Sequence, residues 1–197
     1  MRKVSVNVYQ FDELSDDAKQ RALESLRYVN VDGVCNDWAD HTIENFKKNL
    51  TEQGFDVDKV SYSGFCSQGD GASFTGRIKD FKKFCMKTGF EFPKDNEKFM
   101  AIAAEDWDLS IERDEWHYYH SYTVTPHVRD YHLNTDYTKA AIALEKFMGD
   151  WQVEQSNQLY KELEDYYFQL TSNEEVREAI IANDWEFWAD GTRYKGE

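Results

Sequence analysis

Residues 56–78 read Asp-Val-Asp-Lys-Val-Ser-Tyr-Ser-Gly-Phe-Cys-Ser-Gln-Gly-Asp-Gly-Ala-Ser-Phe-Thr-Gly-Arg-Ile. Polar and apolar residues alternate on both sides of a glycine-rich centre, which predicts a strand, a turn and a second strand. Asp70-Gly71 is a dipeptide that favours a tight type I′ turn. The stretch therefore predicts a β-hairpin, the basic unit of an antiparallel sheet.

A second hairpin is predicted from Trp107–Arg113 and Trp116–Val128, joined by Asp114-Glu115. With those two residues as the turn, Ile111 faces Tyr118 across the strands and Leu109 faces His120. Most of the aromatic and aliphatic side chains then share one side, which we expect to be the core.

Helical patterns surround the two hairpins. Caps and apolar stripes predict helices over 16–29 after Ser15, from Asn36 or Asp37 to Gly54, over 78–85, and around 98–104. The longest pattern runs from Tyr137 to Leu170 after Asp136, with a break near Gly149 as the alternative. Ser172 or Asn173 caps a last short helix that ends at about Ala182. Asp190-Gly191 predicts a closing hairpin in the tail.

Strands and helices are mixed in this order and do not alternate regularly. We therefore predict an α+β fold: a mostly antiparallel sheet of hairpins packed against several helices, with a long C-terminal helical segment. No linker or repeat interrupts the chain, so a single acidic domain over residues 1–197 is expected.

The composition indicates a folded protein of the cytoplasm. Aromatic residues make up 16% of the chain, far more than disordered chains contain. No apolar run approaches the roughly 20 residues that span a bilayer, so no membrane association is expected. Residues 3–9 alternate as a strand does and do not resemble a secretion signal. Three cysteines, an odd number, argue against a disulfide framework.

The formal net charge is −15, and it is unevenly distributed. Residues 1–100 hold 15 Lys and Arg against 17 Asp and Glu, whereas residues 101–197 hold 8 against 21. Such a chain repels a nucleic-acid backbone, so no direct nucleic-acid binding is expected, and it is attracted to a basic protein surface. Solubility alone is the alternative explanation of the charge.

The glycine-rich loop is the first candidate binding site. Small residues let a ligand approach the backbone, and successive N–H groups can hold an anion. Basic residues follow the loop, so a nucleotide or cyclic nucleotide is a candidate ligand, although no Walker or dinucleotide motif is present. The alternative is a plain turn followed by a solvated helix. The candidate ligand-binding residues are Ser67, Gln68, Gly69, Asp70, Gly71, Arg77, Lys79, Lys82 and Lys83.

Histidines and cysteines are the remaining candidates for chemistry. Four histidines fall within 16 residues, namely His117, His120, His127 and His132. His117 and His120 would point to opposite faces of a strand, and no metal-binding spacing is present. A metal-dependent hydrolase is therefore an alternative that needs ligands from elsewhere, and we expect no cofactor. Cys66 with a histidine could form a nucleophilic pair, but a structural cysteine is far commoner.

The order of motifs resembles a family of small proteins encoded by phages and prophages, some of them labelled antitoxin-like. The residues that carry the resemblance are Phe11, Glu13, Leu14, Ser15, Ala18, Lys19 and Ala22; Ser63 to Phe74; His117 to Tyr122; and Asn183, Phe187, Asp190 and Gly191. The resemblance spans nearly the whole chain and implies an origin on a mobile element. It transfers no site residue, and Cys66 stands at a variable position of the central motif.

These observations favour a non-catalytic protein over an enzyme. Acidic side chains on long helices can imitate phosphates, and exposed tyrosine and tryptophan residues are typical of contact surfaces. We expect a phage-type, anti-defence inhibitor in the host cytoplasm that binds a host protein with a basic surface, for instance a defence or nucleic-acid-handling factor. The candidate partner-binding residues are Glu162, Glu164, Asp165 and Tyr166.

Overall fold

The computed structural model describes residues 5–32, 37–114, 118–130 and 135–196, and it shows an α+β protein. The chain groups into two compact units: unit 1 comprises residues 1–39 and 164–197, and unit 2 comprises residues 40–163. The elements are β1 (Tyr9–Gln10), η1 (Phe11–Glu13), α1 (Asp16–Ser25), α2 (Asp40–Glu52), β2 (Phe55–Ser63), β3 (Gly71–Ile78), α3 (Phe81–Thr88), α4 (Asn96–Asp106), β4 (Trp107–Arg113), η2 (Ser121–Thr123), β5 (Val124–Asp130), α5 (Thr135–Leu170), α6 (Asn173–Ala182) and β6 (Glu186–Phe187). The single domain over residues 1–197 stays a prediction.

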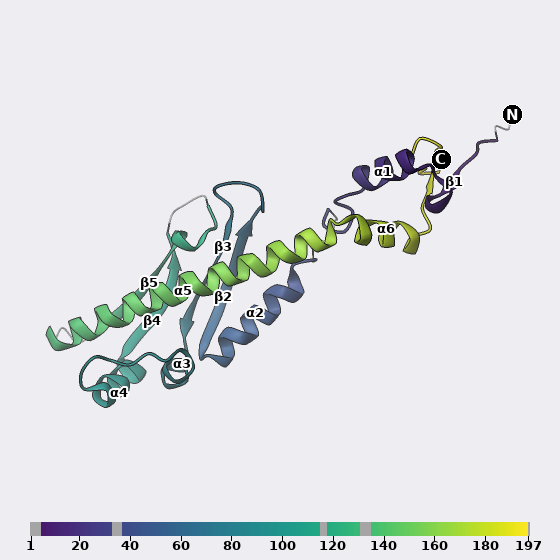
Figure 1. Ribbon diagram of the computed structural model, residues 1–197. Helices are drawn as coiled ribbons and strands as arrows, with labels where there is room; N and C mark the ends of the chain where they lie inside the picture. Colours follow the sequence, from purple (N-terminus) through teal and green to yellow (C-terminus); the bar gives the residue numbers. More distant parts are fainter. Residues whose placement is uncertain (1–4, 33–36, 115–117, 131–134, 197) are drawn as a thin grey trace. The chain divides into compact units, whose positions relative to one another are not determined.

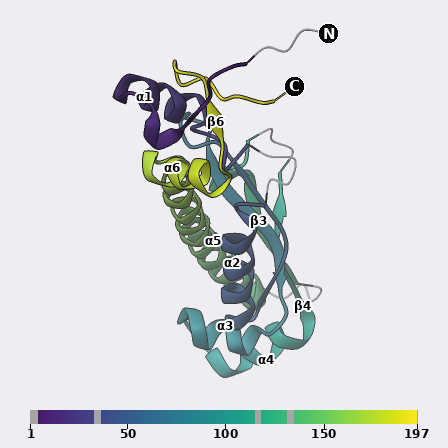
Figure 2. The ribbon, with the colours of Figure 1, turned by 90° about the vertical axis from the view of Figure 1, so that its right-hand side faces the viewer.

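Unit 2 is built on a four-stranded antiparallel sheet in the order β2-β3-β4-β5. Helices α2 and α5 lie along one face of this sheet, and α3 and α4 lie at one end of it (Figures 1 and 2). The opposite face carries none of the described helices (Figure 2). The predicted fold class is confirmed, including its long C-terminal helical segment.

Aromatic side chains hold α5 against the sheet of unit 2. The ring of Trp151 on α5 lies 5.0 Å from that of Phe84, 5.3 Å from Phe55 and 5.8 Å from Phe74 between ring centroids. Phe46 of α2 meets Phe74 at 5.3 Å, so both helices pack on the same buried strand residues. Edge-to-face contacts of this kind contribute beyond the area they bury.

The predicted helices are present, but some of their bounds and caps were wrong. Helix α1 ends at Ser25 and not at residue 29, α2 begins at Asp40 and not directly after Asn36 or Asp37, and α5 begins at Thr135, before the predicted cap Asp136. Two helices begin at the predicted caps. The hydroxyl of Ser15 accepts a hydrogen bond from the backbone N–H of Ala18, and that of Ser172 accepts one from Glu175. Each bond satisfies one of the N–H groups that a helix start leaves unpaired. The alternative of a break near Gly149 is wrong, because α5 continues through it without interruption.

The hairpin of β2 and β3 is confirmed, but its predicted turn is wrong. Ser63 pairs with Gly71, so the connection is the seven-residue loop 64–70 and Asp70-Gly71 is not a two-residue turn. The carboxylate of Asp70 instead organises this loop: its Oδ2 accepts hydrogen bonds from the N–H groups of Cys66 (2.9 Å) and Ser67 (2.6 Å). An aspartate that binds nearby backbone groups replaces the backbone pairing of a tight turn.

The predicted bounds of β4 are confirmed, and β4 pairs antiparallel with a strand that shares residues 124–128 with the predicted one, but the predicted register and turn are wrong. Leu109 pairs with Val128 and Ile111 with Pro126, so the partner strand is β5 and not the aromatic segment before it. Of the predicted partner, residues 115–117 lie outside the described residues, and Tyr118 to Thr123 form an irregular connection that includes η2. Because β5 is an edge strand, Pro126 costs the sheet no ladder bond.

Unit 1 has its own small core. Phe11, Ala18, Ala22, Ile180 and Phe187 are among its buried residues, drawn from both ends of the chain. The predicted tail hairpin is confirmed, because Trp188 donates a backbone hydrogen bond to Thr192 across the Asp190-Gly191 turn. The predicted strand over residues 3–9 is wrong for its described part: residues 5–8 are irregular, and β1, which pairs with β6, begins only at Tyr9.

Candidate functional sites

The glycine-rich loop lies beside the Tyr/His segment that precedes β5. A Cβ at Gly71 would lie 2.6 Å from Cα and Cβ of His120, and a Cβ at Gly69 would lie 3.0 Å from the ring of Tyr118. Because these two glycines lack a side chain, the loop can pack closely against a segment that lies about 50 residues later in the sequence. Gln68, Asp70, Gly71, His120, Tyr122 and Tyr160 are among the residues around a hollow of about 320 Å³, which we call the loop pocket.

The predicted basic residues do not join this loop. Arg77 is the penultimate residue of β3, whereas the loop precedes its first residue, Gly71. At about 3.3 Å per strand residue, roughly 20 Å separate the two ends of the strand. Lys79 pairs with Asp56, and Lys83 Nζ lies 3.3 Å from the carbonyl oxygen of Thr51. Lys82, in the exposed part of α3, also belongs to this far end. The structure thus divides the predicted ligand site into two separate groups.

A second hollow lies within unit 1, and we call it the acidic groove. It measures about 420 Å³, and Asp37, Trp38, Tyr166, Glu175 and Glu178 are among the residues that line it. The ring of Trp38 lies 6.1 Å from that of Tyr166 between centroids. Within the described parts of the chain, the three carboxylates have no ion-pair partner. The groove therefore combines aromatic surface with uncompensated negative charge.

The acidic groove is positioned by the end of α5 and the segment after α1. Asn30 Nδ2 donates to the carbonyl of Leu170 at 3.0 Å, and Arg27 Nη1 donates to that of Thr171 at 3.3 Å. These bonds satisfy carbonyl groups that the end of a helix leaves unpaired. They hold Arg27 and Asn30 against the α5–α6 turn.

The predicted partner-binding residues fall in different places. Tyr166 lines the acidic groove. Glu164 and Asp165 precede it on α5 in unit 1, whereas Glu162 belongs to unit 2 and accepts a hydrogen bond from Gln158 Nε2 at 3.0 Å. Sequence reasoning missed Asp37, Trp38, Glu175 and Glu178, and no local motif marks them.

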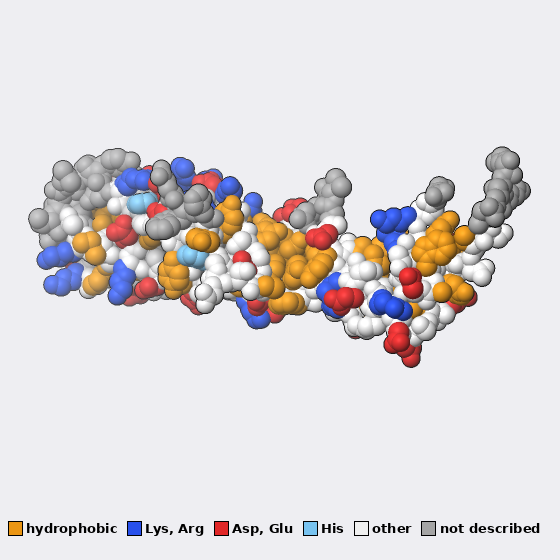
Figure 3. Space-filling view, turned by 90° about the horizontal axis from the view of Figure 1, so that it is seen from above, with side chains coloured by type: hydrophobic (Ala, Val, Ile, Leu, Met, Phe, Trp, Pro, Cys, Tyr) orange, Lys and Arg blue, Asp and Glu red, His pale blue; other side chains and the backbone are white. Residues whose placement is uncertain are grey.

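Charge on the surface is mixed. On the face drawn in Figure 3, Lys and Arg side chains lie among Asp and Glu side chains. Unit 1 holds 8 Lys and Arg against 16 Asp and Glu, and unit 2 holds 15 against 22. Relative to its number of residues, unit 1 is therefore more acidic than unit 2. Along the sequence, the excess of acidic residues lies mainly in residues 101–197.

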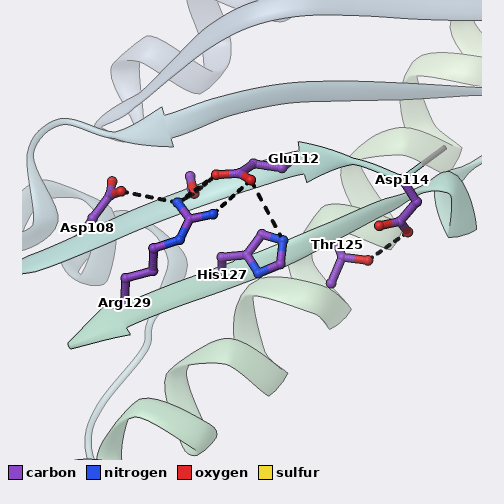
Figure 4. A network of polar contacts seen from close by, with 7 residues as sticks. Asp108, Glu112, Asp114, Thr125, His127 and Arg129 are labelled. Atoms are coloured by element: carbon purple, nitrogen blue, oxygen red, sulfur yellow. Dashed lines mark hydrogen bonds and ion pairs between the residues drawn. The ribbon is translucent and has the colours of Figure 1, made fainter. Parts of the chain in front are cut away.

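A network of charged side chains joins β4 to β5 (Figure 4). Arg129 binds Glu112 through both carboxylate oxygens, at 2.7 and 2.8 Å, and also reaches Asp108 at 3.2 Å. Its guanidinium and the hydroxyl of Ser110 lower the pKa of Glu112 from the ordinary 4.5 to about 2. His127 Nε2 lies 3.9 Å from the same carboxylate. The ion pairs of the network link β4 to β5 and thereby stabilise the strand pair.

Histidines and cysteines do not assemble a metal site in the described part of the chain. Within it, no three His, Cys, Asp or Glu side chains approach closely enough to hold a metal ion. His117 and His132 lie outside the described residues, so the hydrolase alternative stays a prediction. Cys66 is exposed. Cys85 is buried, and this burial raises the pKa of its thiol to about 12. None of the described helices combines the length and the apolar character needed to span a bilayer.

The chain belongs to a family described as a domain of unknown function (DUF8835), whose model matches residues 38–173. The match covers more than half of the chain, including all of the sheet and α5. No curated protein and no solved structure matches the chain. The family thus groups the chain with relatives but assigns it no activity.

Proposed function

We propose that this chain is a non-catalytic, phage-type binding protein that inhibits a host factor by direct contact through the acidic groove. The observation that carries the proposal is the meeting of Trp38 and Tyr166 with Asp37, Glu175 and Glu178 around one hollow. Aromatic faces attract cations, and carboxylates pair with them. The groove therefore suits an arginine or lysine side chain on a basic host surface.

Two further observations support an occupant of this chemistry. The three groove carboxylates lack an ion pair within the described part of the chain, so an incoming cation would not displace an internal one. The twofold excess of acidic over basic residues in unit 1 would also speed the encounter with a positive surface. A host protein that itself binds nucleic acid or defends against phage offers such a surface.

Affinity capture from bacterial cytosol tests the proposal. The full chain and an Asp37→Asn/Glu175→Gln/Glu178→Gln variant are used as bait at about 50 and about 300 mM salt, and bound proteins are identified by mass spectrometry. We expect the wild type to capture a basic protein at low salt, to retain less of it at high salt, and to lose it in the variant.

The matched control changes the same net charge elsewhere. Glu44, Glu52 and Glu105 are exposed residues of unit 2, so Glu44→Gln/Glu52→Gln/Glu105→Gln should leave the capture unchanged. Partners that persist in the groove variant, or that are lost equally in the control, would refute the proposal that this groove is the contact surface.

A further inference from the structure

The loop pocket in unit 2 is a second hollow, separate in composition from the acidic groove. Aromatic side chains reach it from two elements: His120 and Tyr122 from the segment at η2, and Tyr160 from α5. Tyr122 is 75% exposed, and its ring meets that of His120 edge to face at 5.9 Å between centroids. An aromatic side chain this exposed, at the rim of a hollow, is available to stack on a planar ligand.

The base of the loop pocket is rigidly built. Gln152 of α5 is almost fully buried, and its Nε2 donates both to the carbonyl of Ser121 and to the hydroxyl of Ser156, at 3.2 and 2.8 Å. On the other side, Gly71 allows the backbone of His120 to approach β3 more closely than any side chain would permit. These contacts tie two lining residues, Ser121 and His120, to α5 and β3, and groups that are held in place before binding lower its entropic cost.

The polar groups of the loop pocket are mainly side-chain amides and an imidazole, with one carboxylate, that of Asp70. Nδ1 of His120 accepts a hydrogen bond from the N–H of Tyr122 at 3.3 Å, so in the neutral ring the proton lies on Nε2, which can donate. The side chains of Gln68 and Asn157 each add an amide donor and an amide acceptor. The Asp70 carboxylate is already bound to two backbone N–H groups.

No lysine or arginine is among the residues that line the pocket. The predicted basic residues lie at the other end of β3, so none of the described lining residues carries a positive charge that would pair with a phosphate. An anionic nucleotide is therefore a poor match, and a neutral planar heterocycle is a good one.

We propose that the loop pocket binds the base of a nucleoside, with adenine as the closest match. A side-chain amide can pair with the adjacent donor and acceptor on an edge of adenine, while aromatic rings contact its face. The volume of about 320 Å³ is at the lower end of the range for ligand sites and suits a base or nucleoside. This site would act independently of the acidic groove.

Isothermal titration of the full chain with adenosine, guanosine, cytidine, uridine and AMP tests the proposal. We expect adenosine to bind with a Kd on the order of 0.1 mM, typical of a ligand of this size. AMP should bind no more tightly than adenosine. Tyr122→Ala should weaken adenosine binding at least about fivefold, the lower limit for loss of a stacked ring. Asn157→Ala should weaken it by about fivefold as well, the effect of losing a hydrogen bond of about 1 kcal/mol.

Two controls separate the pocket from the rest of the molecule. Gln158→Ala removes an exposed amide from the neighbouring position of α5, and Tyr28→Ala removes an exposed tyrosine of unit 1; both should bind adenosine as the wild type does. Absence of binding by all four nucleosides would overturn the proposal. So would AMP binding that is much tighter than adenosine binding and is abolished by Lys82→Ala/Lys83→Ala.

Discussion

At the scale of the residue, the structure explains several polar side chains by what they hold in place. Asp70 organises the loop 64–70 through two backbone N–H groups, although the sequence predicted it as half of a tight turn. Glu112 is held by Arg129 and Ser110, which lower its pKa to about 2. Asp70 and Glu112 each form hydrogen bonds or ion pairs with neighbouring groups of the chain. Glu175 accepts a hydrogen bond from Gln169 Nε2 at 3.2 Å, but no ion pair within the described residues neutralises it, Asp37 or Glu178, and for that reason these three carry the functional proposal.

The Glu112 contact predicts a dependence of stability on pH. A carboxyl group whose pKa falls from 4.5 to about 2 on folding stabilises the protein above about pH 4.5, and this stabilisation is lost as the pH falls towards 2. Glu112 is partly exposed, so Glu112→Gln should lower the free energy of unfolding by no more than about 1 kcal/mol at pH 7. Urea unfolding between pH 7 and pH 2.5 measures the difference in unfolding free energy between the wild type and Glu112→Gln, which should shrink as the pH falls.

The exposed Glu105 provides the comparison for this pH series, since Glu105→Gln should have no comparable effect. If the difference in unfolding free energy between the wild type and Glu112→Gln stays the same across the pH range, the ion pair with Arg129 contributes nothing to stability.

At the scale of the element, the sequence predicts what local signals determine. Ser15 and Ser172 begin helices where capping chemistry places them, and the bounds of β4 follow from its alternation. The pairing of β4 could not be predicted in the same way. The aromatic segment and β5 both follow β4 and both alternate, and alternation alone does not fix which of two segments pairs or in what register.

Helix α5 supplies a prediction at this scale. Gly149 lies in the helix interior, where a Cβ would meet only Pro126 Cγ at 3.6 Å, an ordinary contact distance. Glycine destabilises a helix interior relative to alanine, so Gly149→Ala should raise the free energy of unfolding by up to about 1 kcal/mol. Urea denaturation measures this gain, and a loss of stability would show that α5 does bend or pack more tightly at this position.

The candidate sites lie beyond local prediction for a physical reason. The acidic groove joins residues from both ends of the chain, with Trp38 and Tyr166 separated by more than 100 positions. The loop pocket likewise needs Asn157 of α5 beside the loop that precedes β3. Of the groove residues, sequence reasoning identified only Tyr166. The spacing of Asn157 and Tyr160, three apart and hence on one helix face, was the only available signal for that side of the pocket.

At the scale of the whole molecule, α5 runs through residue 163 from unit 2 into unit 1. The expectation of a single domain predicts that both units lose structure together. Phe187 is fully buried in unit 1, so Phe187→Ala should cost about 3–5 kcal/mol. If the chain is one cooperative domain, amide signals of both units should then disappear at the same, lowered urea concentration.

Exposed Ile181 of unit 1 gives the control, because Ile181→Ala should leave the urea midpoint nearly unchanged. Signals of unit 2 that keep their wild-type midpoint in the Phe187→Ala protein would contradict the single domain and would make unit 1 an independently unfolding body.

The central claim is that the acidic groove binds a cationic side chain of a host protein. The most direct measurement is the affinity of the captured partner for the wild type, the groove variant and the unit 2 charge control at about 50 and about 300 mM salt. We predict that affinity falls with salt for the wild type and the control, and that the groove variant binds weakly at both concentrations. Equal affinity of the groove variant and the wild type would contradict the claim.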